Sequence, residues 1–301
     1  MIKAEQLSKK YGDKLAVDQL TFEVKPGIVT GFLGPNGAGK STTMRMILGI
    51  DNPSGGRVTV NGKSYRDLAA PIQEIGALLD ASAVHVGRSA WHHLNWQAKA
   101  AGLATRRVDE VLELVGLNDV AGRKVGGFSL GMYQRLGIAS ALLGDPPALI
   151  LDEPVNGLDP EGIRWVRSLF RRFADEGRTV FVSSHLMSEM ELTADHVLVI
   201  GRGKLIADMP IAEITQRSNL NHVKVVAPQA AQLALLLESA GASISQSVEH
   251  ELIVSGITAP AIGEIAVQHG IVLHELAPRR ASLEAAFMEL THDSVDYRAA
   301  S

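Results

Sequence analysis

One nine-residue segment, GPNGAGKST at residues 34–42, restricts the fold more than any other part of the chain. It matches the pattern G-x-x-x-x-G-K-[ST], in which backbone N–H groups of a glycine-rich loop surround the phosphates of a nucleotide. Such a loop works only between a buried strand and a helix. The run IVTGFLG precedes it with strand character and KSTTMRMILGI follows it with helix character, so the segment predicts a strand, a phosphate loop and a helix.

The residue types of this loop predict a nucleoside triphosphate site rather than a glycine-rich turn before an ordinary helix. Lys40 would supply positive charge to the β- and γ-phosphates as a catalytic cation, and Ser41 would offer its hydroxyl to Mg²⁺. A dinucleotide site would require G-x-G-x-x-G, which this loop lacks. The nucleotide-binding residues predicted here are Gly34, Pro35, Asn36, Gly37, Ala38, Gly39, Lys40, Ser41 and Thr42.

Two acidic residues end a second buried strand, in the segment ALILDEP at residues 148–154. Open α/β sheets bind ligands at the carboxyl ends of their strands, which is where these acids would emerge. Asp152 would hold Mg²⁺ together with Ser41, mostly through water. Glu153 would polarise the attacking water as a general base. The alternative is a solvated pair of helix-capping acids.

The next predicted strand ends in VSSH, at residues 182–185. A histidine at this position could donate a hydrogen bond to the γ-phosphate and so detect its presence. A lone histidine usually has no such role. The location of His185 at a strand end of the same sheet nevertheless favours membership of the site.

A second glycine- and serine-rich helix start, GGFSLGMYQRLGIAS, occupies residues 126–140. The first turn of a helix has free backbone N–H groups and the positive end of the helix dipole, so it can bind an anion. Ser129 adds a hydroxyl, and Gly131 allows close approach to the backbone. These features predict a second phosphate contact, about ninety residues after the first.

Length and composition set wider limits. The chain has 301 residues, 46% of them hydrophobic, and no cysteine, which excludes disulfides and thiolate chemistry. A net charge of −4 argues against a nucleic-acid partner. No apolar run approaches the ~18 residues that a membrane helix needs. We therefore expect a protein that is soluble by itself and acts at a membrane only through a partner.

The order of strands and helices predicts two domains. Up to about residue 210 strands alternate with helices, which indicates an α/β core with a parallel sheet, and residues 81–141 have helical character. Beyond Pro210 the pattern is β-α-β-β-α-β with a final helix, the ferredoxin-like order, and its last strand is expected at residues 271–276. The predicted domains are residues 1–210 and a small α+β domain at residues 211–301.

Five segments in this order, GPNGAGKST, FSLGMYQR, LILDEP, NGLDP and VSSH, resemble the motifs of the ATP-binding subunits of ABC transporters. The resemblance covers about residues 1–210. It implies a RecA-like phosphate-loop core with an antiparallel β subdomain and a helical subdomain, ATP and Mg²⁺ as cofactors, and ATP hydrolysis coupled to transport. It also implies that Tyr11, in LSKKYG, stacks on the adenine.

The resemblance assigns further roles to the second helix start. In the family this signature sequence binds the γ-phosphate of ATP held by the other subunit, so Ser129 and Gly131 would complete the site of a second copy of the chain. Asp159, in NGLDP, matches the loop that crosses between the two sites. A symmetric pair that sandwiches two ATP molecules is the expected assembly.

The sequence departs from the family pattern at two points. The commonest signature is LSGGQ, whereas Leu130 and Met132 replace its first glycine and its glutamine here. Asp80 stands about where the family has a glutamine that links Mg²⁺ to the membrane subunit. Asp80 is either a water-mediated Mg²⁺ contact or simply a loop acid. Some exporter-type subunits that resemble this chain also carry an acid there.

Together these features predict the ATPase subunit of an exporter, similar to the drug and antimicrobial-peptide type. Its partner would be a separately encoded membrane permease, and it would lie at the cytoplasmic face of the plasma membrane as a peripheral protein. The alternative is a soluble ABC-type ATPase without a transport role. The second domain would be regulatory, would stabilise the dimer, or would have no separate activity.

Overall fold

The computed structural model describes residues 1–218, 220–248 and 250–291. The described chain separates into two compact units, Met1–Ile211 together with Thr291, and Ala212–Leu290. The first contains a six-stranded and a three-stranded sheet, and the second contains a four-stranded sheet. The last residues of the second predicted domain, 292–301, lie outside the described residues.

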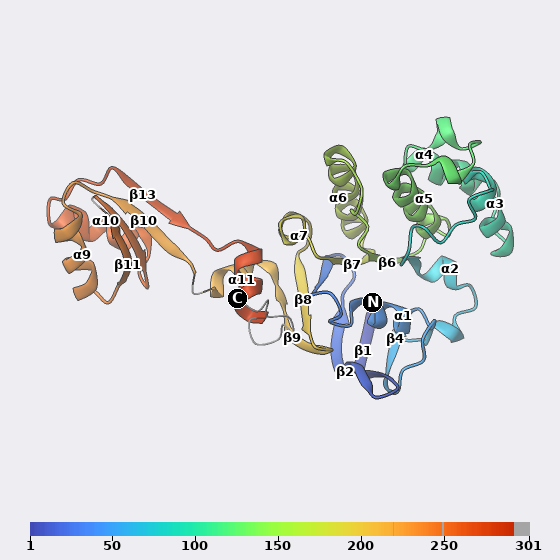
Figure 1. Ribbon diagram of the computed structural model, residues 1–301, viewed down its shortest axis with the longest axis horizontal. Helices are drawn as coiled ribbons and strands as arrows, with labels where there is room; N and C mark the ends of the chain where they lie inside the picture. Colours follow the sequence, from blue (N-terminus) through green and yellow to red (C-terminus); the bar gives the residue numbers. More distant parts are fainter. Residues whose placement is uncertain (219, 249, 292–301) are drawn as a thin grey trace. The chain divides into compact units, whose positions relative to one another are not determined.

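A six-stranded sheet carries the phosphate loop of the first unit (Figure 1). Its order is β5-β6-β7-β3-β8-β9; the first five strands are parallel to their neighbours, and β9 is antiparallel to β8. The central strands are buried on both faces, as apolar runs in parallel sheets require. The strands are β3 (Val29–Leu33), β5 (Gly76–Leu78), β6 (Ala148–Asp152), β7 (Thr179–Ser184), β8 (His196–Gly201) and β9 (Lys204–Pro210).

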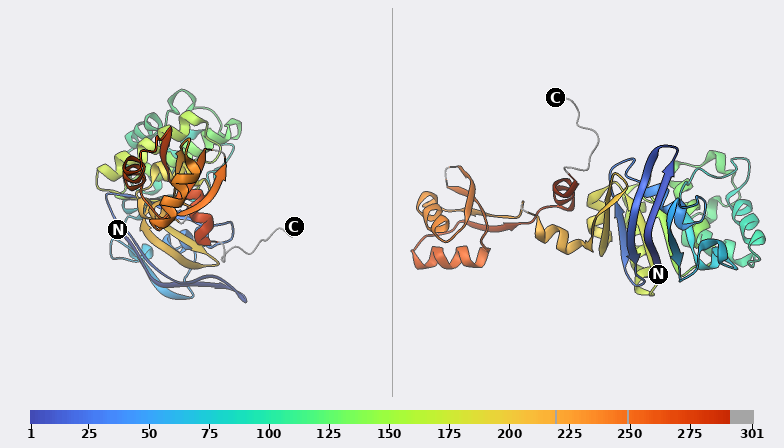
Figure 2. Two further views of the ribbon diagram at one scale, coloured as in Figure 1. Left: turned by 90° about the vertical axis from the view of Figure 1, so that its left-hand side faces the viewer. Right: turned by 90° about the horizontal axis from the view of Figure 1, so that it is seen from below.

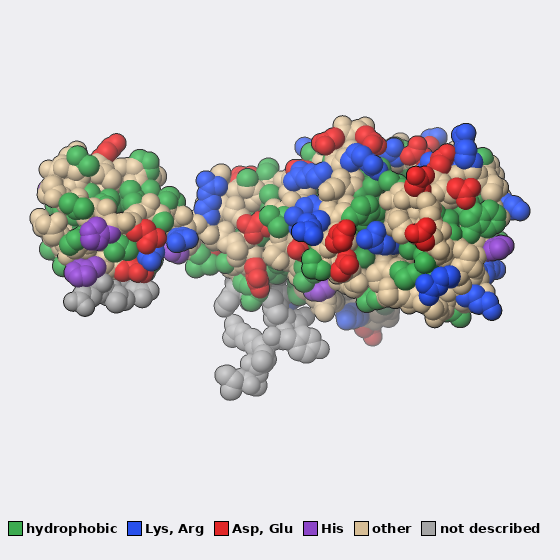
Figure 3. Space-filling model, turned by 90° about the horizontal axis from the view of Figure 1, so that it is seen from above, with side chains coloured by type: hydrophobic (Ala, Val, Ile, Leu, Met, Phe, Trp, Pro, Cys, Tyr) green, Lys and Arg blue, Asp and Glu red, His purple; other side chains and the backbone are tan. Residues whose placement is uncertain are grey.

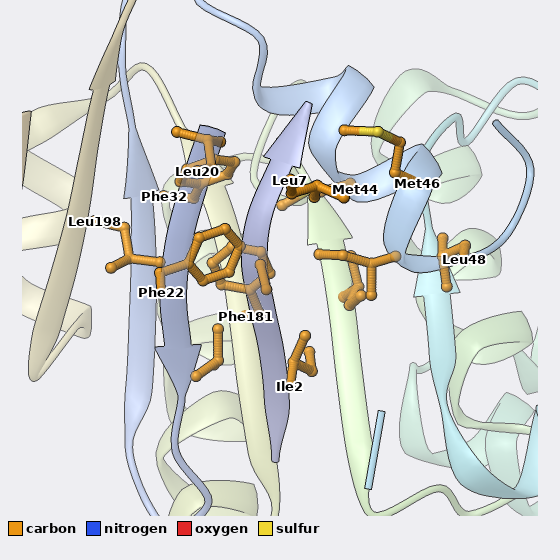
Figure 4. Close-up of a cluster of buried hydrophobic side chains, with 14 of the residues drawn as sticks. Ile2, Leu7, Leu20, Phe22, Phe32, Met44, Met46, Leu48, Phe181 and Leu198 are labelled. Carbon is orange, nitrogen blue, oxygen red and sulfur yellow. The ribbon is translucent and has the colours of Figure 1, made fainter. Parts of the chain in front are cut away.

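A three-stranded antiparallel sheet packs against this core in the order β2-β1-β4. It consists of β1 (Ile2–Tyr11), β2 (Lys14–Val24) and β4 (Gly55–Val60), and the first two strands are seen most plainly in the right-hand view of Figure 2. Phe22, Phe32 and Phe181 are buried in the hydrophobic cluster of Figure 4, with ring centroids 5.1 to 6.1 Å apart. The cluster also includes buried residues of α1 (Lys40–Ile47), the helix after the phosphate loop.

The remaining helices of this unit fall into two groups. Helices α3 (Ala90–Ala100), α4 (Arg106–Leu114) and α5 (Leu130–Leu142) gather into a helical subdomain (Figure 1). The core has the helices α2 (Pro71–Glu74), α6 (Pro160–Asp175) and α7 (Met187–Thr193), and short 3₁₀ turns lie at Tyr65–Asp67, Asn118–Val120 and Val125–Gly127. This architecture confirms the predicted α/β class, a RecA-like core with an antiparallel β subdomain and a helical subdomain.

Two arginines of α6 form ion pairs with acids that lie on or just after α7. Arg167 pairs with Glu189 at 2.7 Å, and Arg171 pairs with Asp195 at 2.5 Å. In Figure 3, basic and acidic side chains are interspersed on the visible face of the first unit. The more exposed of the two pairs, Arg171–Asp195, contributes only about 0–1 kcal/mol to stability.

The second unit has the topology that the sequence predicts. Its strands lie in the order β11-β12-β10-β13 and all neighbours are antiparallel, which is the ferredoxin-like arrangement. The unit contains α8 (Ile211–Arg217), β10 (His222–Val226), α9 (Ala230–Ser239), β11 (Ser243–Val248), β12 (Glu251–Ser255), α10 (Ala259–Gln268), β13 (Glu275–Arg279) and α11 (Leu283–Thr291). Helix α8 was not predicted.

The last strand of this unit starts later than expected. The prediction of a strand at residues 271–276 is wrong for residues 271–274, because β13 begins at Glu275. The backbone N–H of Ile271 donates to the carbonyl of Ala266 at 2.8 Å, and Gly270 has a φ of 64°. These residues therefore close the end of α10 in a helix-capping turn, and extended pairing can begin only after it.

No helix among the described residues is both long and apolar enough to cross a membrane.

The aromatic cluster predicts a clear stability effect. Phe181→Ala should lower the free energy of unfolding by about 3–5 kcal/mol, because the side chain is completely buried and its loss leaves a cavity. Leu192→Ala removes a side chain that is 57% exposed and should change stability by less than about 0.5 kcal/mol. Urea unfolding of both variants checks this, and equal losses would contradict it.

Candidate active site

The phosphate loop joins the carboxyl end of β3 to the start of α1, and glycines are required there for steric reasons. A Cβ atom on Gly34 would lie 2.5 Å from the carbonyl oxygen of Ile200. Gly39 caps the helix with a φ of 108°, and a Cβ there would lie 2.7 Å from the carbonyl oxygen of Ala16. Any larger residue at either position would displace the loop from the neighbouring backbone.

The Lys40 ammonium group is held by the loop itself. Its Nζ donates to the carbonyl oxygens of Gly34 at 2.6 Å and Pro35 at 3.3 Å, and the residue is only 7% exposed. Burial lowers the pKa of Lys40, and the nearby carboxylates of Glu153 and Asp152 oppose that shift. The loop therefore keeps a buried cation close to the two acids at the end of β6.

The Asp152 carboxylate connects the phosphate loop to two strands. Its Oδ2 accepts a hydrogen bond from Ser41 Oγ at 2.6 Å, and its Oδ1 accepts one from Ser183 Oγ. Asp152 and Ser183 are direct partners in the register of β6 and β7. The arrangement brings together the hydroxyl and the carboxylate predicted to hold Mg²⁺, which prefers oxygen ligands and keeps several waters. No group of three or more histidine and acidic side chains at metal-binding spacing occurs among the described residues.

Glu153 adopts an unusual backbone conformation. Its φ is 51°, a left-handed value that costs a non-glycine residue of order 1–3 kcal/mol. Its N–H donates to Ser183 Oγ at 3.0 Å, and its carbonyl accepts from Gln134 Nε2 at 2.7 Å. The carboxylate oxygen Oε2 accepts hydrogen bonds from His185, from Nδ1 at 2.8 Å and from the backbone N–H at 3.3 Å. Backbone and side chain of the proposed base are thus both held.

A cavity of about 370 Å³ brings together nine of the predicted site residues. Two further residues in its lining, Lys14 and Ala16, were not predicted. Lys14 is the partner of Tyr11 in the pairing of β1 with β2. The lining residues are Tyr11, Lys14, Ala16, Asn36, Gly37, Gly39, Lys40, Ser41, Thr42, Asp152 and Glu153.

Tyr11 lies at the rim of the cavity and is 46% exposed. Its hydroxyl donates to Asp51 Oδ2 at 2.7 Å, and Arg45 Nε donates to the same oxygen at 2.8 Å. The hydrogen bond to Asp51 raises the pKa of Tyr11, and the hydrogen bond from Arg45 lowers the pKa of Asp51 to about 2. This network fixes the hydroxyl end of the ring, while Lys9 Nζ lies 4.9 Å from the ring centroid.

The other predicted site residues lie outside the lining of this cavity, among them the three that the resemblance assigns to contacts between two subunits. Ser129 is exposed and caps α5, where its Oγ accepts from the N–H of Met132 at 3.3 Å. Gly131 follows it in the first turn. Asp159 caps α6 by accepting from the N–H of Gly162 at 2.7 Å. The second helix start is therefore open at the surface and separate from the chain's own phosphate loop.

Asp80 also lies outside the cavity lining. It follows β5, the neighbour of β6, and its Oδ1 accepts from Ser82 Oγ at 2.6 Å and Ser82 N–H at 2.8 Å. These hydrogen bonds lower the pKa of Asp80. A contact between Asp80 and Mg²⁺ stays a prediction.

Two residues that contact the acids of the site were not predicted from the sequence. Ser183 contacts both Asp152 and Glu153, and Gln134 contacts Glu153 from the helical subdomain. Both stand inside motifs that the sequence singles out, VSSH and FSLGMYQR. Their roles depend on strand register and on the packing of α5, which a motif pattern does not contain.

Comparisons with known proteins show what the chain is similar to. A family model described as ABC transporter matches residues 17–156, and one described as a domain of unknown function matches residues 221–284. The bacitracin transport ATP-binding protein BcrA of Bacillus licheniformis is 43% identical over 221 residues, 72% of each chain. The uncharacterized ABC transporter ATP-binding protein YhcH of Bacillus subtilis is 37% identical over 297 residues, 98% of this chain and 97% of that one.

A solved structure described as the ATP binding subunit of an ABC transporter has a TM-score of 0.66 at 27% identity, and covers 72% of this chain and 92% of that chain. The chain belongs to the ATP-binding subunits of ABC transporters, which bind and hydrolyse ATP.

Proposed function

We propose that the chain powers the export of an antimicrobial compound through a separately encoded membrane subunit. The observation that carries this proposal is the linked set Lys40, Ser41, Asp152 and Glu153 around one cavity. The likeness to a bacitracin transport protein and the acid at Asp80 support export. The compound itself is selected by the membrane subunit.

In the proposed reaction the loop N–H groups and Lys40 bind the phosphates of ATP. Ser41 and Asp152 fit Mg²⁺ by their chemistry, a hydroxyl and a carboxylate 2.6 Å apart, and the bound ion would neutralise charge on the phosphate oxygens. Lys40 exchanges its two carbonyl partners for phosphate oxygens. Tyr11, fixed by Asp51 at the rim, stacks on the adenine.

Glu153 orients the water that attacks the γ-phosphate and accepts its proton. His185, whose Nδ1 donates to the Glu153 carboxylate, keeps that carboxylate aimed and detects the γ-phosphate. Positioned general bases of this kind contribute about 10²–10⁴-fold to a rate.

The base assignment predicts a separation of binding from chemistry. Glu153→Gln should lower kcat by about 10²–10⁴-fold, because the amide cannot accept the proton, and ATP affinity should be retained. Glu113→Gln makes the same change at an exposed position of α4 and should leave both unchanged. Phosphate release and fluorescent-nucleotide binding measure the two effects. A wild-type rate for Glu153→Gln would show that another group is the base.

The exposed start of α5 supports a two-subunit site. Ser129 and Gly131 lie outside the cavity of their own chain, at a helix end that favours an anion. We infer that they bind the γ-phosphate held by a second copy of the chain. Two copies related by a two-fold axis would then complete two sites.

Substitutions at this helix start should separate binding by one subunit from turnover. Ser129→Arg or Gly131→Asp should leave ATP binding by the monomer intact and abolish hydrolysis, since the partner's γ-phosphate loses its contact. Ser168→Arg, on the exposed face of α6, is the matched control and should keep wild-type turnover. Full turnover by either signature variant would contradict a shared site.

The helical subdomain has a surface suited to the membrane subunit. Trp96 of α3 is 56% exposed between two hollows of about 470 and 570 Å³, with the Arg88 guanidinium 5.2 Å from its ring. Exposed tryptophan is the residue type that most often anchors a protein interface, and the guanidinium beside it adds hydrogen-bond donors. Docking there would hold the chain at the cytoplasmic face of the plasma membrane.

A substitution at this docking surface should weaken binding to the membrane subunit and leave ATP hydrolysis unchanged. Trp96→Ala should reduce co-purification with the co-expressed membrane subunit by about tenfold or more, as for an interface hot spot. The ATPase rate of the isolated chain should be unchanged. Leu192→Ala, at an exposed apolar residue of α7, serves as the control. Unreduced co-purification would exclude this surface.

A further inference from the structure

Helix α5 and its cap carry two residues with a proposed link to ATP hydrolysis. Its exposed first turn carries Ser129, the residue assigned above to the γ-phosphate of the partner's ATP. Five residues further along, the Gln134 side chain is 5% exposed and donates to the backbone carbonyl of Glu153 at 2.7 Å. Five residues of helix correspond to roughly 7.5 Å along its axis. Two turns of one helix thus lie between the γ-phosphate proposed for the partner's site and the proposed base, Glu153, of the chain's own site.

The Gln134 contact acts on the backbone of Glu153 at its strained position. Glu153 has a left-handed φ of 51°, and its peptide groups are held on both sides, the N–H by Ser183 of β7 and the carbonyl by Gln134 of α5. Such a conformation persists only when its surroundings hold it. Without the Gln134 donor the Glu153 carbonyl keeps only the backbone N–H of Asn156, at 3.2 Å, and loses its shorter hydrogen bond, the one that ties it to α5.

Further contacts fix the same helix to the residues that follow the base. A Cβ atom on Gly157 would lie 2.2 Å from Leu130 Cδ2, and one on Gly131 would lie 3.2 Å from the Gly157 carbonyl oxygen. The Arg135 guanidinium lies 4.7 Å from the ring centroid of Trp165 in α6. The first turns of α5 are therefore packed against residues 153–159 and against α6, so a displacement of α5 displaces this segment as well.

We propose that Gln134 is a positioning residue for Glu153, and that through it α5 couples the two ATP sites of the dimer. This inference rests on the proposed function. When Ser129 contacts the γ-phosphate in the partner's site, α5 takes up one defined position, and Gln134 then holds Glu153 of its own chain in the productive orientation. Each base is aligned only when the other subunit's nucleotide is in place.

Gln134→Met tests the positioning role, because methionine has a similar length and shape but cannot donate a hydrogen bond. We expect kcat to fall by about 10- to 100-fold, the cost of a misdirected catalytic group, with an unchanged KM for ATP. The exposed Gln73 provides the matched control Gln73→Met, which should keep the wild-type kcat. Gln134→Leu, which is also similar in size and cannot donate a hydrogen bond, should show the same loss and serves if the methionine variant does not fold.

A double-variant cycle tests the coupling. If α5 transmits contact from Ser129 to Glu153, Ser129→Ala combined with Gln134→Met should lose less kcat than the product of the two single losses. Losses that multiply would overturn the coupling, and a wild-type kcat for both Gln134 variants would overturn the positioning role. Glu153→Gln is measured alongside. If it is inactive while the Gln134 variants are normal, only this inference fails; if it is active, the proposed base fails as well.

Discussion

The site depends first on one carboxylate, that of Asp152. It accepts hydrogen bonds from Ser41 at the start of α1 and from Ser183 near the end of β7. Because Asp152 is itself the last residue of β6, it joins the phosphate loop to β6 and β7. Charge-assisted hydrogen bonds to an ionised acceptor are among the stronger ones in proteins. Without this acid the hydroxyl of Ser41 would have no fixed direction, and the loop would be held by its backbone contacts alone.

Electrostatics explain why two adjacent acids can remain together at this edge. Lys40 is buried and its pKa is lowered by that burial, but Asp152 and Glu153 favour its charged form. In turn the lysine offsets the mutual repulsion of the two carboxylates. The result is a site in which opposite charges are kept close but not directly paired, since Lys40 donates to carbonyl oxygens of its own loop. A phosphate chain can replace those carbonyls without breaking an ion pair.

Features that depend on local chemistry could be predicted from the sequence. The glycines of residues 34–42 follow from steric limits of a tight loop, and the two acids follow from their location at the end of an apolar strand. The ferredoxin-like order of the second unit followed from short strands alternating with apolar helices. The contacts of Ser183 and Gln134 could not be predicted, because they arise from the register of β6 and β7 and from the packing of a helix far away in sequence.

The two units have separate hydrophobic clusters, each built from its own stretch of the chain. The buried cluster of the ATPase unit takes its side chains from residues 2–200, whereas the second unit's cluster comes from residues 223–271. On the second unit's sheet, the Lys224 ammonium group forms ion pairs with Glu251 at 3.3 Å and Glu275 at 3.2 Å. These pairs join β10 to both of its neighbouring strands. The hydrophobic cluster beneath the phosphate loop is therefore built from side chains of the first unit. The residues proposed here to bind and hydrolyse ATP lie in the same unit, so its core supports the strand ends that carry them.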